Sequence, residues 1–181
     1  MSRPGGDPSD EVLAASANAG DRGALEILLA RHLDRVHAIC RRVTGHPEDA
    51  LDATQEALIA VTRGLHRYDG RSLFTTWLYR VATNAALDEL RRRKRHATLA
   101  AEPADDAARP AEDHADLALR RAAVQAALAT LSPRDREVVA LRFHAGLETA
   151  EVADVLGVSR SNAATLLHRA MTKLREALDD R

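Results

Sequence analysis

Residues 149–159 read TAEVADVLGVS, a stretch with the spacing of two short helices joined by a tight turn. Such a pair needs a small residue where the two backbones approach, which Ala153 supplies. It also needs a residue that tolerates positive φ at the turn, and Gly157 stands four positions later. The apolar positions that would hold the two helices together are Val152, Leu156, Val158, Ala163 and Leu166. The stretch therefore predicts a helix-turn-helix.

The second helix of this pair would present polar side chains, and Ser159 can cap its start. At the N-terminal end of a helix-turn-helix reading helix, such side chains meet base edges in the major groove, each good pair contributing about 1–3 kcal/mol of discrimination. Donors further along the helix suit DNA phosphates. The candidates are Arg160, Ser161, Asn162 and Thr165 at the start, then His168, Arg169, Lys173 and Arg175. Any tight helical hairpin with a glycine turn shares this pattern, so the stretch alone favours DNA binding without establishing it.

The rest of the chain also predicts helices, and an all-α fold. No run of β-branched and aromatic residues alternates with period two, and aromatic residues make up only 3% of the 181 residues. Caps and apolar stripes predict helices over 10–20, 21–45, 47–64 and 72–95, with Asp21 capping the second and Ser72 the last. They predict further helices over 116–131, 132–146, 149–156 and 160–178, with Ser132 capping the second of these.

Between these two groups of helices, residues 97–115 are rich in Ala, Pro and acidic residues and have no periodicity. We expect a flexible acidic linker that divides the chain into helical domains at 10–96 and 116–181. The net charge is −1, but residues 91–95 are five consecutive cations and residues 96–115 carry a net of four negative charges. At a Debye length of about 8 Å such patches act locally, so a DNA-binding surface is compatible with this composition.

Several function classes are disfavoured. With a single cysteine, no intrachain disulfide forms, the first residues lack the apolar core of a signal peptide, and no apolar run approaches the roughly 20 residues of a membrane span. We expect a soluble cytoplasmic protein without membrane insertion. The cluster His32, His37 and Cys40 is the best case for a metal or redox enzyme, but two ligands on one helix face do not close a site. We predict no catalytic site, metal or cofactor. A helix-turn-helix repressor or response-regulator effector domain remains an alternative that accounts for the second half of the chain only.

Two blocks of sequence resemble one family. LSPRDREVV at 131–139 and the segment from Glu151 to Ala170 are similar to the fourth region of bacterial extracytoplasmic-function (ECF) sigma factors, members of the sigma-70 family. DALDATQE at 49–56, FTTWLYR at 74–80 and NAALDELRR at 84–92 are similar to the second region of the same family. The blocks stand in the family's order and cover nearly the whole chain outside its first residues and the linker.

The resemblance implies a transcription initiation factor with region 2 at 10–96 and region 4 at 116–181. Its partners would be RNA polymerase core (the β′ clamp helices and the β flap) and promoter DNA, with an anti-sigma factor as a further candidate partner. Core binding would fall on one polar face of a helix, carrying Asp49, Asp52, Gln55 and Glu56. The −35 element would be read by Arg160, Ser161, Asn162, Thr165, His168, Arg169 and Lys173, and the −10 element by Tyr68, Asp69, Arg71, Trp77, Asn84, Asp88, Arg91 and Arg92.

Four of the five aromatic residues lie within residues 68–79. The loop 68–72 would accept an unstacked base, and base–aromatic stacking adds about 1–3 kcal/mol. We expect Phe74 in the core and leave Trp77 open between core and base contact. The family often has Lys and Arg where this chain has Ala164 and Leu166, so we expect a salt dependence of DNA binding that is lower by roughly one unit per lost phosphate contact. The acidic linker would pass near the RNA exit path and mimic nucleic acid there, a hypothesis tested by neutralising its carboxylates.

Overall fold

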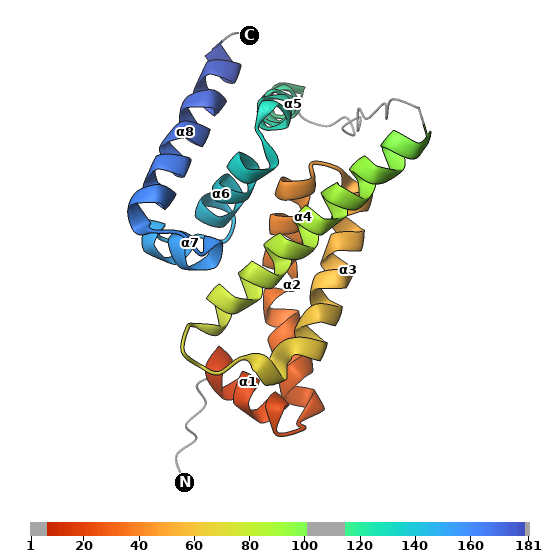
Figure 1. Ribbon diagram of the computed structural model, residues 1–181, viewed down its shortest axis with the longest axis vertical. Helices are drawn as coiled ribbons and strands as arrows, with labels where there is room; N and C mark the ends of the chain where they lie inside the picture. Colours follow the sequence, from red (N-terminus) through yellow and green to blue (C-terminus); the bar gives the residue numbers. More distant parts are fainter. Residues whose placement is uncertain (1–6, 101–114, 180–181) are drawn as a thin grey trace.

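The structure is a computed structural model that describes residues 7–100 and 115–179, with side chains for 7–96 and 122–179. The described residues form helices and no strand, which confirms the predicted all-α class. The elements in Figure 1 are α1 (Asp10–Asn18), α2 (Arg22–Thr44), α3 (Pro47–Gly64), the 3₁₀ turn η1 (Leu65–Arg67), α4 (Phe74–Ala100), α5 (Ala115–Thr130), α6 (Pro133–Phe143), α7 (Thr149–Leu156) and α8 (Arg160–Asp179).

The predicted helix caps Asp21, Ser132 and Ser159 are confirmed, and the predicted cap Ser72 is not. Asp21 accepts a hydrogen bond from the Ala24 N–H at 3.1 Å, and α2 ends at Gly45 with φ +83°. Ser132 and Ser159 cap α6 and α8 as predicted. The prediction that Ser72 caps the helix after the loop was wrong. That helix, α4, begins one residue later, at Phe74, because the Ser72 carbonyl accepts the Tyr68 hydroxyl, and the Leu73 carbonyl takes the first helical hydrogen bond, from Trp77.

The predicted bounds of the linker also need correction. Helix α4 continues through residues 97–100, which include the good helix formers Ala and Leu, and α5 begins at Ala115. Residues 101–114, and with them most of the predicted acidic linker and its proposed RNA-like role, lie outside the described residues.

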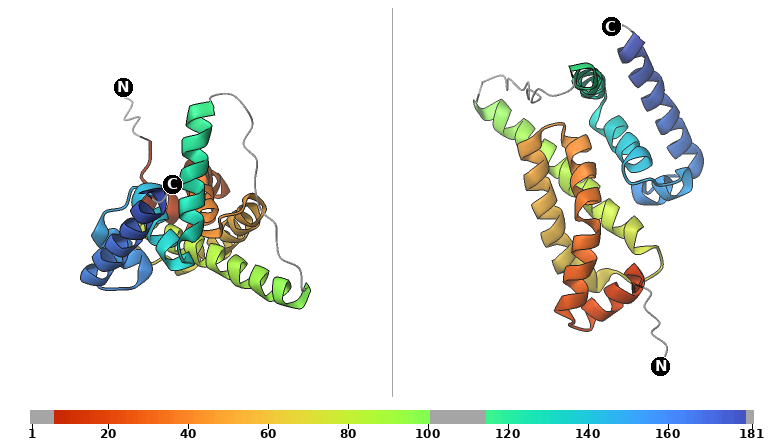
Figure 2. Two further views of the ribbon diagram at one scale, coloured as in Figure 1. Left: turned by 90° about the horizontal axis from the view of Figure 1, so that it is seen from above. Right: turned by 180° about the vertical axis from the view of Figure 1, so that it is seen from behind.

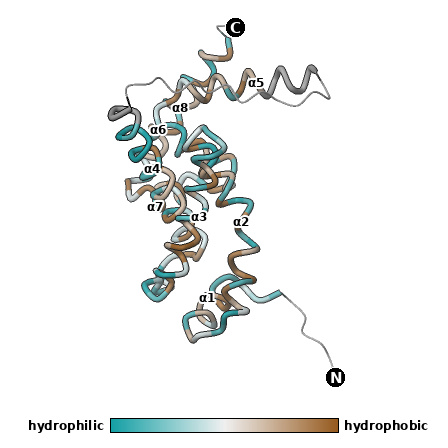
Figure 3. Tube along the Cα trace, turned by 90° about the vertical axis from the view of Figure 1, so that its right-hand side faces the viewer, coloured by the Kyte–Doolittle hydropathy of each residue, from teal (hydrophilic) through white to brown (hydrophobic). Residues whose placement is uncertain are grey.

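The first four helices form one packed unit. Helices α2, α3 and α4 lie against each other and α1 crosses α2, as the right-hand view of Figure 2 shows. Alanines along one face of α3 let its backbone approach its neighbours, and larger apolar residues from α2 and α4 fill the space. The buried set includes Leu28, Val36, Ile39 and Val43 of α2, Ala50, Ala53, Ala57 and Val61 of α3, and Phe74, Leu78, Ala82 and Ala86 of α4. Figure 3 shows hydrophobic and hydrophilic residues alternating within the helices, the pattern of elements with one buried face.

Helices α5 to α8 form the second unit, which packs directly on the first. Helix α6 lies against α2 and α7 against α4, and Leu141, Leu147 and Val152 join the same continuous apolar core as the first four helices. A smaller cluster of Leu128, Leu131, Val139 and Ala170 holds α5, α6 and α8 together. The sequence predicted two domains joined by a tether, but it did not predict this contact between them.

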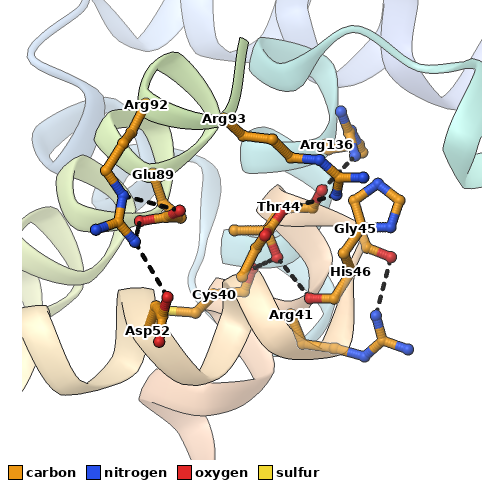
Figure 4. A network of polar contacts seen from close by, with 11 residues as sticks. Cys40, Arg41, Thr44, Gly45, His46, Asp52, Glu89, Arg92, Arg93 and Arg136 are labelled. Carbon is orange, nitrogen blue, oxygen red and sulfur yellow. Dashed lines mark hydrogen bonds and ion pairs between the residues drawn. The ribbon is translucent and has the colours of Figure 1, made fainter. Parts of the chain in front are cut away.

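One arginine marks the contact between the two units. Arg136 of α6 donates from Nη1 to the Thr44 carbonyl at the end of α2, at 3.3 Å (Figure 4). A Cβ at residue 45 would lie 2.6 Å from this same nitrogen, so a larger residue there would displace the end of the Arg136 side chain and would also have to adopt the positive φ that favours glycine. Burial lowers the pKa of Arg136. The contact therefore places a desolvated guanidinium between the units.

Candidate nucleic-acid interface

The helix-turn-helix forms where the sequence predicts it. Gly157 has φ +65°, and the Val158 N–H bonds back to the Ala153 carbonyl at 3.0 Å, which turns the chain from α7 into α8. Val152, Ala153 and Ala163 are buried between the two helices. At the start of α7, the Glu148 N–H donates to the Glu151 carboxylate at 2.7 Å. The hairpin is therefore a packed, capped unit.

The outer side of α8 carries most of the residues proposed to read DNA. Ser161, Thr165 and His168 stand at i, i+4 and i+7, which brings them onto one side of the helix, and all three are exposed. Arg160 and Asn162 are exposed beside them at the helix start. At the two positions where the chain departs from its family, Ala164 is exposed and Leu166 is half-buried.

Arg169 and Lys173, the other two residues proposed for DNA, bind a carboxylate of the protein itself. Arg169 donates to Asp135 of α6 from Nε at 3.2 Å and from Nη2 at 2.8 Å, and Lys173 donates from Nζ at 2.7 Å. The Ser132 hydroxyl donates a further bond at 2.8 Å. Burial raises the pKa of Asp135, but the bonds from Lys173, Arg169 and Ser132 outweigh it and hold the pKa at about 2. Sequence reasoning missed Asp135, whose only signal was an acidic residue in the first turn of a helix.

The acidic face of α3 lies beside the arginine run of α4. Asp52, Gln55 and Glu56 are exposed there, and Asp49 is half-buried. Arg93 pairs with Asp49 at 2.8 Å. Arg92 pairs with Asp52 at 3.0 Å and also bonds Glu89, as Figure 4 shows. The arginine run is thus more than a solvated helix end, because two of its members hold α3 and α4 together.

A groove of about 520 Å³ between α3 and α4 brings two sets of predicted residues together. Its lining residues are Glu56, Ala60, Val81, Asn84, Ala85, Asp88, Glu89, Arg92 and Arg95. Asn84 is exposed, and Asp88 is ion-paired with Arg91. The groove is therefore lined by acidic and basic side chains and by the Asn84 amide. It also brings Glu56, predicted to bind the polymerase, next to residues predicted to read the −10 element.

The aromatic residues form a cluster beneath the loop 68–72. Phe74 is fully buried, as predicted, and the Tyr68 ring meets it edge-on at 5.6 Å between centroids. Trp77 is half-buried, 5.8 Å from both of these rings. The Asp69 carboxylate bonds the Arg71 N–H at 3.1 Å, and both side chains are exposed. The aromatic rings thus pack against one side of the loop, and the Asp69 and Arg71 side chains on its other side are exposed to solvent.

The three residues considered for a metal or redox site each have a separate partner or environment, and they do not form one site. The His32 Nε2 is 2.7 Å from the Asp10 carboxylate, and the His37 Nδ1 is 3.1 Å from the Thr54 hydroxyl. Cys40 is fully buried, and burial raises its pKa to about 11, as expected for a thiol packed as a small apolar residue. Among residues 7–100 and 115–179, no group of three or more metal-ligating side chains comes together, and no helix is long and apolar enough to cross a bilayer.

Comparison with known proteins identifies the class that these surfaces belong to. The family description Sigma-70 region 2 matches residues 28–96, and Sigma-70, region 4 matches residues 127–176. The first covers the α3–α4 groove and the second covers the helix-turn-helix. Both halves of the interface thus lie within regions of one kind of protein.

Individual relatives narrow the class. The chain is 34% identical to the ECF RNA polymerase sigma factor SigM of Mycobacterium tuberculosis (strain ATCC 25618 / H37Rv), over 94% of this chain and 85% of that protein. It is 28% identical to the ECF RNA polymerase sigma factor SigW of Bacillus subtilis (strain 168), over 89% of this chain and 92% of that protein. The solved structure of CnrH in complex with the cytosolic domain of CnrY superposes with a TM-score of 0.71 at 28% identity, covering 96% of this chain and 99% of CnrH. The chain belongs to the ECF RNA polymerase sigma factors.

Proposed function

We propose that this protein binds RNA polymerase core and directs it to promoters that carry −10 and −35 elements. The observation that carries the proposal is the presence, in one chain and in order, of a region 2 with a charged groove and a region 4 with an exposed helix-turn-helix reading face. A repressor or response-regulator effector domain would need only the second of these. We assign region 2 to residues 10–96 and region 4 to residues 116–181.

Region 2 would hold both the polymerase and the −10 element. The exposed carboxylates of α3, with Gln55, suit the basic side chains of a partner helix, and we assign the β′ clamp helices to this face. The opened −10 strand would lie along the α3–α4 groove, where Asn84 offers both a donor and an acceptor to a base edge. Tyr68 and Trp77 support the loop that would take an unstacked base.

Region 4 would read the −35 element with α8 in the major groove. Arg160, Ser161, Asn162, Thr165 and His168 are exposed at or near its N-terminal end, the end that meets bases in this motif. A second contact of region 4, with the β flap, would anchor it on the polymerase. The chemistry of RNA synthesis then belongs to the polymerase, and this chain acts without a catalytic site, in the cytoplasm where the polymerase works.

The two promoter elements lie far apart compared with this molecule. About 25 base pairs separate them, which is roughly 85 Å of duplex at 3.4 Å per base pair. A compact globule of this length has a radius of gyration of only about 16 Å. Region 4 therefore has to leave its contact with α2 and α4 when both elements are read. CnrH, which superposes on 96% of this chain, is in complex with the cytosolic domain of CnrY, and we propose that an anti-sigma partner of this chain would favour the arrangement in which regions 2 and 4 are in contact.

Reconstitution with core polymerase tests this function. Purified protein should comigrate with core and give transcripts with defined start sites from genomic DNA, and sequencing those transcripts yields the promoter. Asp52→Lys with Glu56→Lys should abolish comigration, because the variant places cations on the polymerase-binding face. Glu26→Lys, which reverses an exposed charge on α2, is the matched control and should bind core normally.

A base-reading variant completes the test. Asn162→Ala should leave core binding intact and reduce transcription from the mapped promoter by about five- to 150-fold, the effect of losing 1–3 kcal/mol of base contact. Tight binding of the protein to duplex DNA without core, together with no effect on core transcription, would overturn the proposal in favour of an independent regulator.

A further inference from the structure

A fully buried carboxylate ties the reading helix to the helix that precedes the hairpin. Asp135 has no exposed side-chain surface, yet it accepts hydrogen bonds from Arg169, Lys173 and Ser132. Charge-assisted bonds of 2.7–2.8 Å are the strong kind, and a buried carboxylate depends on them, because water cannot replace the lost donors. The cluster therefore fixes α8 on α6 at one defined register.

The helical register places these two cations at one edge of the DNA-reading row, on the edge that faces α6. Ser161, Thr165, His168 and Thr172 follow one line on α8, at i, i+4, i+7 and i+11. At 3.6 residues per turn, Asn162 shares the side of α8 that carries these two cations, but it stands two to three turns nearer the helix start. Arg169 lies about 40° around the helix from Thr165 and Lys173 about 80° from it. The side chains of Arg169 and Lys173 are about half exposed, at 52% and 44%. Both point toward the start of α6, where Asp135 lies.

The two cations also gain more from Asp135 than from a phosphate. An exposed phosphate contact is weakened by salt and competes with water. Taking either cation away from Asp135 leaves a buried carboxylate short of a donor, which is costly in the interior of a protein. Arg169 and Lys173 should thus stay on Asp135 when α8 meets DNA.

We propose that Asp135 is a positioning residue for −35 recognition, and that Arg169 and Lys173 serve this tie instead of contacting DNA. This inference rests on the proposed function and corrects the set of −35 residues that the family resemblance implies. The DNA contacts of α8 then come from Ser161, Thr165 and His168 and from Arg160 and Asn162. Because Ala164 and Leu166 also lack charge, α8 makes few phosphate contacts. Its affinity for DNA then depends on being held at the promoter by the polymerase.

The first measurement is the salt dependence of promoter binding. Holoenzyme is formed with Arg169→Gln, Lys173→Gln or Arg160→Gln, and its binding constant for the mapped duplex promoter is measured over a range of salt concentrations. Arg160→Gln is the matched comparison, since it removes one cation from the same helix without touching Asp135. We expect its slope of log K against log salt to fall by about one, and the other two slopes to stay at the wild-type value. A fall of the same size for Arg169→Gln or Lys173→Gln would overturn the proposal.

The second measurement needs neither polymerase nor promoter. The melting temperatures of the full chain with Asp135→Asn, Arg169→Gln and both together form a double-mutant cycle. Each single variant should melt below the wild type, and the double variant should melt no lower than the less stable single variant. If the melting-temperature losses of the two single variants added up in the double variant, the proposed coupling between Asp135 and Arg169 would be wrong. Because this cycle is independent of transcription, a failure of the proposed function leaves its result interpretable.

The third measurement separates positioning from general stability. Holoenzyme with Asp135→Asn is assayed below its melting temperature on the full promoter and on a forked template that carries only the −10 element. Loss of a fixed reading helix should lower transcription from the full promoter by about tenfold, the effect of roughly 1.4 kcal/mol, and leave the forked template near wild type. Equal losses on both templates would show a merely structural role. If Asp135→Asn fails to fold, Arg169→Gln is used in the same assay, since it keeps the carboxylate bonded by Lys173 and Ser132.

Discussion

The molecule contains two sets of charged pairs that differ in burial and therefore in what they can do. The Asp135 carboxylate is fully buried and bonded by two cations, whereas Asp52 and Arg92 are about half exposed, at 57% and 48%. An exposed pair contributes about 0–1 kcal/mol and is screened by salt, but a buried charge that loses its partner destabilises the fold by about 3–5 kcal/mol. Region 4 thus uses charge to fix a reading helix. In region 2, by contrast, the exposed carboxylates pair only weakly with their arginines, so they can pair with cations of a partner protein instead.

The largest effect should come from removing both cations of the buried cluster. Arg169→Ala with Lys173→Ala leaves Asp135 buried with the Ser132 hydroxyl as its remaining side-chain donor, so we expect the free energy of unfolding to fall by about 3–5 kcal/mol. Urea denaturation followed by circular dichroism measures it. Arg160→Ala with Arg175→Ala removes the same charge from exposed positions of α8 and should change stability by less than about 1 kcal/mol. If the two double variants lost similar amounts of unfolding free energy, the buried cluster would be no more stabilising than exposed charges.

The pH dependence of stability sharpens the same comparison. The pKa of Asp135 is lowered to about 2 in the folded protein, from an ordinary value of 3.8. Its stabilising effect is therefore fully present above the unfolded pKa and is lost as pH falls from about 5 toward 2, a change of about 2 kcal/mol. Burial raises the pKa of Glu137, opposed by the Arg134 charge, so this group acts in the opposite direction.

The difference between two proteins isolates the Asp135 contribution to that pH dependence. The free energy of unfolding of the wild type and of Asp135→Asn is measured between pH 7 and 2.5. The difference between the two values should become smaller as the pH falls. If this difference in the free energy of unfolding stayed constant over the range, the ionised carboxylate would not be stabilised by its neighbours.

The contact between the two regions should give an intermediate effect. Gly45→Ala forces a left-handed backbone onto alanine, at about 1–2 kcal/mol, and puts a methyl group 2.6 Å from Arg136 Nη1. Arg136→Ala removes the contact without backbone strain. Both variants should have a larger radius of gyration by small-angle X-ray scattering, and combining them should add no expansion. An unchanged radius in Arg136→Ala would mean that the apolar contacts alone hold the regions together.

Local patterns predicted the elements of this fold better than they predicted its charged contacts. Caps such as Asp21 and Ser159, and the turn glycine Gly157, act on neighbouring backbone atoms, so the sequence alone locates them. The pairing of Asp135 with Arg169, 34 residues later, depends on how α6 crosses α8, which no periodicity specifies. The same holds for Arg136 at the end of α2 and for Arg93 on Asp49. The predicted site residues were thus mostly found on the surface, but which of them already had partners could not be predicted from their spacing.

The smallest effect on stability should be found at the exposed pair of region 2, where the effect on function is informative. Arg92→Ala removes the pair with Asp52 and should change the free energy of unfolding by no more than about 1 kcal/mol. It leaves the Asp52 carboxylate unpaired by Arg92 and open to cations of the polymerase, so we expect core binding to be unchanged or tighter in a competition assay against wild type. Arg93→Ala is the internal comparison, because Asp49 is only 17% exposed and its loss of a partner should cost more stability. If Arg92→Ala weakened core binding, the arginine itself would belong to the polymerase contact, and the exposed pairs of region 2 would be fixed parts of the interface instead of exchangeable ones.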